Sequence, residues 1–449
     1  MKSLLSFQFS RGINFTSQHM FSKGLIQIKG KLSRVRSSSL AKDSIWLLGS
    51  KGLNIFIQAA YFVVLARTLG PTEYGLFVGV AALATMVNSF ASWGSAQIIV
   101  KHVAVDRSLL KYYWGNALLI VGVMGTLLTL LFTVLGPILS GGAFPPLIVA
   151  LIFIGDLIGF NLNDISDAAF IASGQAKVAA FKSILLGFTK MLAALALAFI
   201  LENGSATQWA YLYCFSTLLT GIISTCLVCA WLDKPKPSIP RLKKELVQGF
   251  YFSVSQSSDF VNENIDRIML ASAASLQATG LYGAGSRIIA VFKILILSVA
   301  GATFPRFFQH GARGIKGSFS FAKKLMPLAV GYGVGVVVVV FIIAPYMQNV
   351  LGEEYEGIVE LLHIVSLVPL IYALQILGGD TLTGANYQRY RTSVQVFAAG
   401  LNVALNIWLI PLFSWRGAAW ATLISETTKA VGFFACTFYL AKKHSITKE

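Results

Sequence analysis

The sequence predicts an all-α protein that crosses a membrane many times, and three observations lead to this fold class. Only 12% of the 449 residues are charged, about half of the roughly 25% typical of soluble proteins. Apolar residues make up 55% of the chain, and the mean hydropathy is +0.70. Several windows of twenty residues hold at most one charge, and this is the length that a helix needs to cross about 30 Å of hydrocarbon. A soluble globular protein is excluded.

Twelve apolar windows follow one another along the chain, and each predicts a transmembrane helix. Most of the 36 lysines and arginines lie in alternate connecting segments, and both chain ends belong to this basic set. The positive-inside rule therefore predicts cytoplasmic N- and C-termini, which requires an even number of spans. The windows are 44–66, 75–97, 113–135, 147–172, 178–200, 208–231, 247–273, 278–303, 325–344, 358–382, 393–412 and 417–440.

The first 43 residues form a cytoplasmic tail whose only charges before Asp43 are basic. The tail lacks the apolar core of a signal peptide, so we do not expect it to be cleaved. Leu25, Ile28, Leu32 and Val35 fall on one helical face, which is typical of a basic amphipathic helix on an anionic membrane surface. A tail that only orients the first span is the alternative. Nucleic-acid binding is not predicted, because no base-reading residues are organised there.

A polar segment at 233–246, rich in proline and lysine, divides the chain and is expected to be a cytoplasmic linker. It separates spans one to six (44–232) from spans seven to twelve (247–440), and residues 441–449 form a second cytoplasmic tail. The two halves match weakly at a constant offset of 205 residues, for example at Gly75-Leu76 and Gly280-Leu281. Because each half has six spans, the repeat predicts two six-helix lobes with the same orientation around a central cavity.

Basic residues within or beside the spans are candidates for a cationic cavity, because a charge at membrane depth costs about 2.5–3.5 kcal/mol on insertion scales. The candidates are Lys51, Lys190, Arg287, Lys293 and Lys429. Lys51 lies close enough to the end of its span to reach the membrane surface. Lys429 follows Glu426 by three residues, so a private ion pair is the alternative for it.

The span at 247–273 carries a polar stripe on one helical face, which cannot face lipid. Its members are Ser255, Asp259, Asn262, Glu263 and Asp266. Asp259 and Glu263 lie deep enough to take up a proton or a cation, and they are candidates for coupling ion flow to transport. Pairing with lysines or with Arg267 is the alternative.

Asp156, in the span at 147–172, is a third coupling candidate on the same grounds. Asp167 and Asp380 end their spans shortly before Gly174 and Gly384, and we expect them to shape those turns. No metal site or cofactor is predicted, because the four cysteines lie in apolar runs without further ligands.

Three segments resemble the polysaccharide biosynthesis flippases, the O-antigen type within the multidrug, oligosaccharidyl-lipid and polysaccharide exporter superfamily. Residues 65–104 (LARTLGPTEYGLFVGV and the residues that follow) are similar to the end of the first helix and to the second helix of this family. Residues 262–288 resemble the matching part of the second lobe, and residues 167–182 resemble the turn between helices four and five. The resemblance covers residues 44–440 and implies the twelve-helix, two-lobe fold.

The function that the resemblance implies is translocation of undecaprenyl-diphosphate-linked oligosaccharide repeat units across the bacterial cytoplasmic membrane. It implies alternating access of a central cavity whose basic residues hold the anionic lipid diphosphate. The product would serve O-antigen, capsule or exopolysaccharide biosynthesis. The implied partners are the lipid bilayer, the lipid-linked sugar, and the polymerase and chain-length proteins of the same pathway, with no nucleic acid.

Two other functions are weighed against this one. A cation-coupled multidrug exporter of the same superfamily would be expected to have an acidic or aromatic cavity, whereas the basic residues here favour an anionic cargo. A membrane-embedded glycosyltransferase or polymerase is disfavoured because the outer loops are short and no GxxxxGK[ST], HExxH or GxSxG motif is present. We therefore expect a transporter and not an enzyme.

Overall fold

The computed structural model describes residues 39–201 and 204–446 of the chain. Side chains are described from residue 52 to residue 443, except at 202–203, 251, 255, 258–259, 261–262 and 302. Within these ranges every regular element is a helix. The predicted amphipathic segment of the N-terminal tail lies outside the described residues.

The first part of the described chain forms seven α-helices, a short 3-10 helix and a π-helical segment. They are α2 (Ser39–Ser92), α3 (Ser95–Val103), η1 (Arg107–Leu109), α4 (Leu110–Leu139), α5 (Pro146–Phe153), η2 (Ile154–Phe160), α6 (Asn161–Ala172), α7 (Ala176–Phe199) and α8 (Ala206–Trp231).

The second part consists of seven α-helices. They are α9 (Ile239–Ala273), α10 (Leu276–Gly311), α11 (Ile315–Leu351), α12 (Ile358–Val365), α13 (Val368–Gly384), α14 (Gln388–Phe413) and α15 (Trp415–Ile446).

The helices confirm a polytopic membrane protein. In the described ranges, 9 helical segments are long and apolar enough to cross a membrane, and they overlap ten of the twelve predicted windows. The windows at 247–273 and 417–440 are helical as well, within α9 and α15, but these two helices are more polar and are not among the nine. The linker expected at 233–246 is shorter than predicted, because α9 already begins at Ile239.

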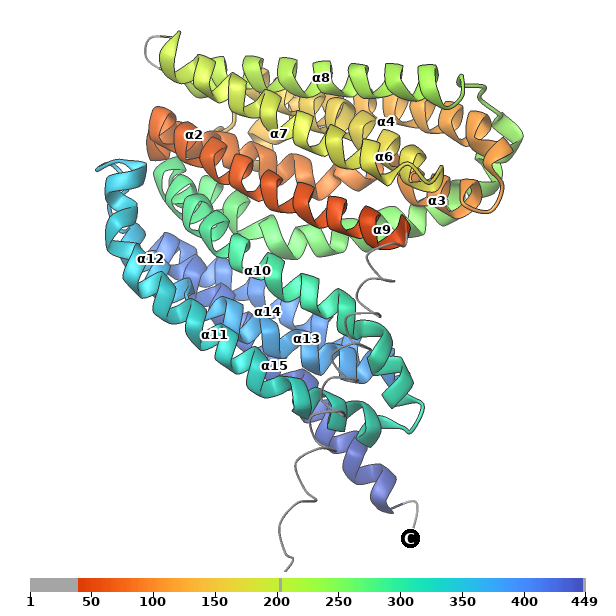
Figure 1. Cartoon of the computed structure of the whole chain (residues 1–449). Coiled ribbons are helices and arrows are strands. Elements are labelled where there is room, and N and C mark those ends of the chain that lie inside the picture. The colour runs from red at the N-terminus through yellow and green to blue at the C-terminus, as the bar shows by residue number, and fades with distance from the viewer. Residues whose placement is uncertain (1–38, 202–203, 447–449) are drawn as a thin grey trace, which may run out of the picture.

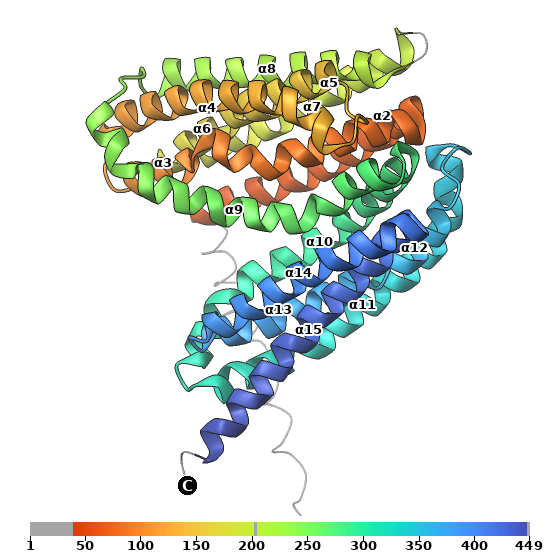
Figure 2. The same cartoon turned by 180° about the vertical axis from the view of Figure 1, so that it is seen from behind.

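Two groups of helices make up the molecule (Figure 1). The N-terminal group contains α2–α8, and the C-terminal group contains α10–α15. Figures 1 and 2 show the groups meeting at one end and separating toward the other, with α9 lying along the N-terminal group before the chain enters α10.

A sharp turn within α2 lies at the end where the two groups meet. Gly70 has φ 67° and ψ 171°, a backbone conformation that residues with a side chain rarely adopt, and Pro71 then starts the second helical segment of α2. The break separates the two windows that were predicted as independent spans at 44–66 and 75–97.

The two groups touch where the second segment of α2 crosses α10. A Cβ atom on Gly75 would overlap the carbonyl oxygen of Leu276, and one on Gly280 would overlap the carbonyl oxygen of Pro71. Both pairs of positions are separated by the 205 residues of the sequence repeat. A contact that is reciprocated between equivalent residues is what a two-fold axis produces, so the repeat generates a pseudo-symmetric crossing.

Candidate cargo cavity between the two helix groups

A cavity of about 900 Å³ lies between α2, α9, α10 and α11. Most of its lining is apolar, from residues such as Phe62, Val78, Ile288 and Met347. Among the described side chains that line it, Arg267 and Arg287 are the only charged ones, and none of these side chains is a carboxylate. The cavity therefore combines apolar walls with a net positive charge.

Arg287 extends from α10 toward the first segment of α2. Its Nη2 donates a hydrogen bond to Oε1 of Gln58 at 3.0 Å, and its Cζ lies 5.7 Å from the centre of the Tyr61 ring. An arginine side chain has five N–H donors, so this contact leaves donors for an anion. Of the predicted cavity residues whose side chains the structure describes, Arg287 is the one that lines this cavity.

Arg267 joins Arg287 in the same lining from α9. Its Nη1 donates to Oδ1 of Asn264 at 2.8 Å, while its Nε is buried and has no hydrogen-bond partner. The sequence suggested Arg267 only as a partner for acidic residues. The structure shows that the equivalent position 205 residues earlier, Phe62, lines the cavity as well, so the two positions of the repeat have equivalent places.

Lys190 lies in the N-terminal group and is not among the residues that line this cavity. Its Nζ donates to the hydroxyl of Tyr213 at 3.1 Å and lies 4.4 Å from the centre of the Tyr213 ring. The same hydroxyl donates to Oδ1 of Asp156. The ammonium group of Lys190 is therefore linked to the carboxylate of Asp156 through the phenol of Tyr213.

Asp156 belongs to the π-helical segment η2, which interrupts the α-helical course of residues 146–172. Such segments are rare and frequently lie at functional sites. Gly159 of η2 packs so closely on α8 that a Cβ atom would contact the backbone of Thr217 at 2.8 Å. Close packing against α8 brings Asp156 within reach of Tyr213.

The two remaining basic candidates that the structure describes lie within the C-terminal group. Lys293 has its Nζ 4.9 Å from the centre of the Tyr372 ring. Lys429 forms an ion pair with Glu426 at 2.8 Å, and Gln375 donates a hydrogen bond to the same carboxylate. The private ion pair considered as the alternative for Lys429 is therefore present.

The sequence profile of the polysaccharide biosynthesis proteins matches residues 40–310. The chain belongs to this family. Over 398 residues, covering 86% of this chain and 94% of the relative, it is 23% identical to a protein of Escherichia coli (strain K12) named "Putative O-antigen transporter".

Two solved structures share the fold of this polysaccharide biosynthesis protein. The lipid II flippase MurJ in an inward closed conformation matches with a TM-score of 0.70 and 12% identity, covering 88% of this chain and 87% of that one. An inward-facing multidrug resistance MATE transporter of the MOP superfamily matches with a TM-score of 0.67 and 15% identity, covering 87% and 95%. Both are transport proteins that span a membrane.

The structure of this family member places the remaining candidates, one basic and two acidic, less fully. The side chains of Lys51 and Asp259 lie outside the described residues, and Glu263 is exposed on α9. Asp266 ends the same polar stripe and is buried. It accepts hydrogen bonds from Tyr282 and Thr422 at 2.8 Å and from Asn406 at 2.7 Å.

Asp266 was part of the predicted stripe but was not singled out as a site. Its hydrogen-bond donors come from α10, α14 and α15, and all three are neutral. Within the described ranges it has no ion pair. This buried carboxylate could therefore take up a proton or a small cation without displacing a built-in cation.

The aspartates expected to shape turns do so through ion pairs. Asp167 pairs with Lys182 at 2.8 Å across the turn between α6 and α7, and Asp380 pairs with Arg391 at 3.2 Å across the turn between α13 and α14. Gly174, in the first turn, has φ 76°. In the described part of the chain no three His, Cys, Asp or Glu residues gather as metal ligands.

Proposed function

We propose that this protein is a flippase that moves lipid-linked oligosaccharide repeat units across the bacterial cytoplasmic membrane for cell-surface polysaccharide biosynthesis. The observation that carries the proposal is the charge of the cavity, where Arg267 and Arg287 line the same space and none of the other described lining residues is a carboxylate. Two guanidinium groups suit the two phosphates of an undecaprenyl diphosphate, because arginine binds phosphate oxygens through several N–H donors.

The apolar part of the lining supports a lipid-linked cargo. Cavity residues from α10 and α11 include Ile294, Leu297, Ile343 and Val350, beside the arginines of α9 and α10. An amphipathic cargo with an anionic head and an apolar chain would bury both parts in suitable surroundings. A volume of about 900 Å³ leaves room for a head group of drug size, since ligand pockets span roughly 300–1,000 Å³.

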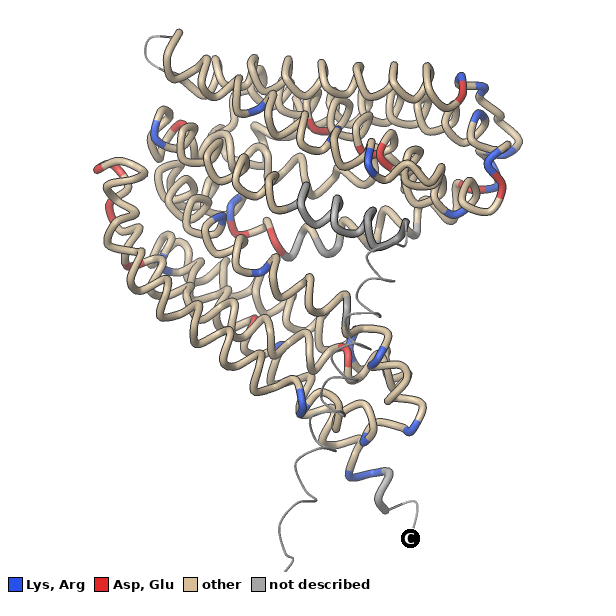
Figure 3. Tube along the Cα trace, viewed as in Figure 1, with Lys and Arg blue, Asp and Glu red and all other residues tan. Residues whose placement is uncertain are grey.

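Twelve spans with both termini in the cytoplasm complete the proposal. Figure 3 shows lysines and arginines gathered at the ends of the helices where the two groups separate. Under the positive-inside rule this end faces the cytoplasm, so the structure corresponds to the inward-facing state. The reciprocal contact of Gly75 and Gly280 then closes the outer end, and rocking of the two groups would provide alternating access.

A cation-coupled multidrug exporter is the second candidate, because a MATE transporter shares the fold. A cavity for cationic drugs would carry carboxylates, and the described lining has none. Ion coupling is compatible with either cargo. Asp156 and Asp266 are the described carboxylates whose burial and partners suit it, while the roles of Asp259 and Glu263 stay predictions.

The test is transport of a fluorescent undecaprenyl-diphosphate-linked sugar in proteoliposomes, together with surface polysaccharide in a strain that lacks its own flippase. Losing one charge-assisted hydrogen bond of about 1.5–3 kcal/mol predicts roughly a 10- to 100-fold loss for Arg287→Ala, and Arg267→Ala should also reduce transport. Arg287→Lys should retain part of the activity, because it keeps the charge but not the planar donors.

Arg306→Ala is the matched control, because Arg306 is an exposed arginine on the same helix and does not line the cavity. Unchanged transport by the Arg267→Ala, Arg287→Ala double variant at wild-type abundance would overturn the anionic-cargo assignment. Export of cationic dyes that survives in this double variant would favour the multidrug exporter instead.

A further inference from the structure

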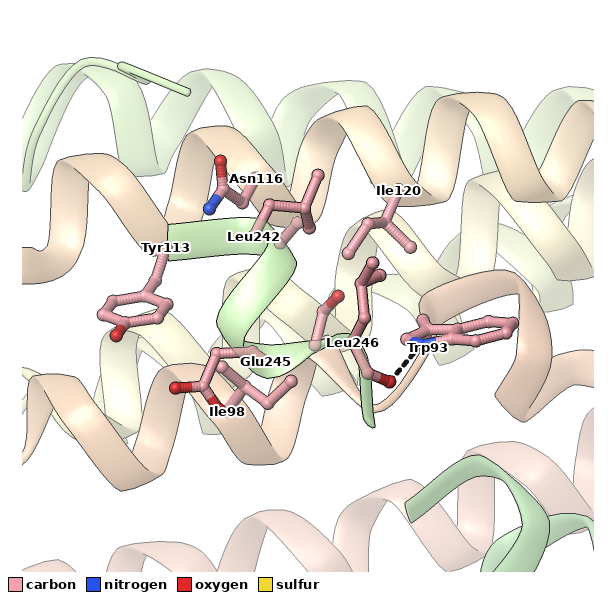
Figure 4. A pocket seen from close by; sticks show the side chains of 10 residues that line it. Trp93, Ile98, Tyr113, Asn116, Ile120, Leu242, Glu245 and Leu246 are labelled. Carbon is pink, nitrogen blue, oxygen red and sulfur yellow. Dashed lines mark hydrogen bonds between the residues drawn. The ribbon is translucent and has the colours of Figure 1, made fainter. Parts of the chain in front are cut away.

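The connector between α8 and the main part of α9, residues 233–246, is docked on the N-terminal group in a defined way. The backbone N–H of Lys236 donates to the carbonyl of Lys111 at 2.8 Å, and the side chain of Asn116 bonds both backbone groups of Ser238. Figure 4 shows Asn116 of α4 beside the first turns of α9, and Trp93 donating to the carbonyl of Leu246. The connector therefore has a fixed position on α4.

This docking gathers basic side chains around one aromatic ring. The Cζ atom of Arg241 lies 4.6 Å from the centre of the Tyr112 ring, and the Nζ atom of Lys111 lies 5.4 Å from the same centre. The two cationic groups are thus at most about 10 Å apart, close to one Debye length at 0.1 M salt, so they repel each other most strongly at low ionic strength. Lys236, exposed beside them, adds a third positive charge.

The acidic residues nearby do not neutralise this cluster. Glu245, on the same helix as Arg241, pairs with His102 at 2.9 Å and with Lys101 at 3.8 Å. Asp106 accepts a hydrogen bond from the backbone of Ser108, and Asp233 accepts one from the backbone of Lys234. Within the described ranges neither Lys111 nor Arg241 has a carboxylate partner, although Arg241 also hydrogen-bonds the Tyr113 side chain.

The same end of the N-terminal group presents apolar side chains to the surroundings. Trp231 at the end of α8 is 59% exposed, and Ile239 at the start of α9 is 51% exposed. Tryptophan and apolar residues beside lysine and arginine are typical of the membrane–water boundary, where the rings lie at the level of the head groups. Figure 3 shows basic residues gathered at this end of the molecule.

We propose that Lys111, Arg241 and Lys236, arranged around Tyr112, bind the phosphodiester head group of an anionic phospholipid in the membrane leaflet that they face. The phosphate lies between the two cations and removes their repulsion, while Trp231 and Ile239 contact its acyl chains. The bound lipid holds the connector against α4, so that the connector moves with the N-terminal group. The site is separate from the cavity and does not depend on the cargo.

The experiment measures lipid binding to the full chain in detergent by native mass spectrometry, with phosphatidylglycerol and phosphatidylcholine as the probes. We expect the wild-type protein to bind phosphatidylglycerol at least 10-fold more tightly than phosphatidylcholine. The Lys111→Gln, Arg241→Gln double variant should lose at least 10-fold of the phosphatidylglycerol affinity, and Tyr112→Leu should lose less because both cations remain.

The matched control is Lys243→Gln with Lys244→Gln, which removes the same charge from two exposed residues of the same connector. Equal losses in the two double variants would overturn the proposal, because they would show a diffuse attraction to positive charge. No loss in either, or equal binding of the two lipids by the wild-type protein, would also overturn it. Inorganic phosphate at millimolar concentration should not displace the lipid; displacement would assign the site to free phosphate.

Discussion

At the centre of the N-terminal group, Lys190, Tyr213 and Asp156 form a chain that already contains both a cation and a carboxylate. Where α9 meets the C-terminal group, Asp266 is held by hydroxyl and amide donors of α10, α14 and α15, and in the described part of the chain it has no ion pair, although the neighbouring Arg267 attracts it electrostatically. A proton or metal cation added to Asp266 displaces no ion-pair partner, whereas one added to Asp156 competes with the ammonium group of Lys190, which is linked to Asp156 through Tyr213.

The two groups nevertheless agree where they pack. Gly75 and Gly280 occupy equivalent positions of the repeat and make reciprocal contacts. Each group also has an acid–base pair across an equivalent turn, Asp167 with Lys182 and Asp380 with Arg391. The comparison teaches that the repeat has kept the residues that set helix crossings and turns, while the polar groups at the two centres have diverged.

The largest expected effect is at the symmetric crossing. Gly75→Val and Gly280→Val should each reduce the free energy of unfolding by about 3 kcal/mol and abolish transport, because each new side chain overlaps a backbone carbonyl of the other group. Thermal unfolding of the purified protein in detergent and the proteoliposome assay would measure both effects.

Gly122→Val is the control for this pair, because a side chain at Gly122 on α4 would meet no atom within 4 Å. If only one of the two crossing variants is destabilised, the contacts of Gly75 and Gly280 are not equivalent in energy. That result would contradict the statement that the two groups agree where they pack.

Asp266→Ala should cost about 3 kcal/mol, because it leaves the buried donors of Tyr282, Thr422 and Asn406 without their acceptor. Asp266→Asn should cost about 1 kcal/mol, because the amide oxygen still accepts from Tyr282 and Thr422 and only the hydrogen bond from Asn406 is lost. Unfolding of the two variants under the same conditions gives the difference in free energy. Equal losses of stability would contradict the conclusion that Asp266 acts as the acceptor for three neutral donors.

The turn pairs offer a finer test because their buried members differ. Lys182 is 1% exposed and Asp167 29%, whereas Arg391 is 24% exposed and Asp380 6%. Removing the more exposed partner leaves a buried charge unpaired, so Asp167→Asn and Arg391→Met should each cost about 3 kcal/mol. Lys182→Met and Asp380→Asn should each cost about 1 kcal/mol, since the group left behind reaches water.

The same unfolding measurement on these four variants tests that ranking. The reverse order in either turn would show that packing of the aliphatic stems, and not the unpaired charge, governs these sites.

The smallest expected effect is at the closed end. The hydroxyl of Tyr355 donates to the carbonyl of Ala66 at 2.9 Å, joining the loop before α12 to α2. Tyr355→Phe should reduce the free energy of unfolding by about 1 kcal/mol, the usual value of one hydrogen bond. It should also speed the labelling of a cysteine introduced at this end by a thiol-directed reagent. Tyr346→Phe is the control, because Tyr346 is exposed. Equal labelling of the introduced cysteine in both variants would show that the hydrogen bond of Tyr355 does not help to close this end.

Much of the fold could be predicted because the bilayer restricts the choices. A spanning segment needs about twenty apolar residues and must satisfy its backbone internally, so hydropathy alone located the helices. The connector was harder. Its prolines and lysines indicated a linker, but Asn116 and the carbonyl of Lys111 hold the segment, and α9 begins there. Those partners lie more than a hundred residues away in sequence.

The candidate site was predicted only in part. The sequence by itself determined an all-helical membrane protein, a repeat of 205 residues and a set of charges that cannot face lipid. Which charges share a space was set by packing, because a helix offers several faces and the neighbour that covers each face comes from distant parts of the chain. Lys190 therefore bonds Tyr213 within its own group, while Arg267, which the sequence suggested only as a partner for acidic residues, joins Arg287 in the cavity.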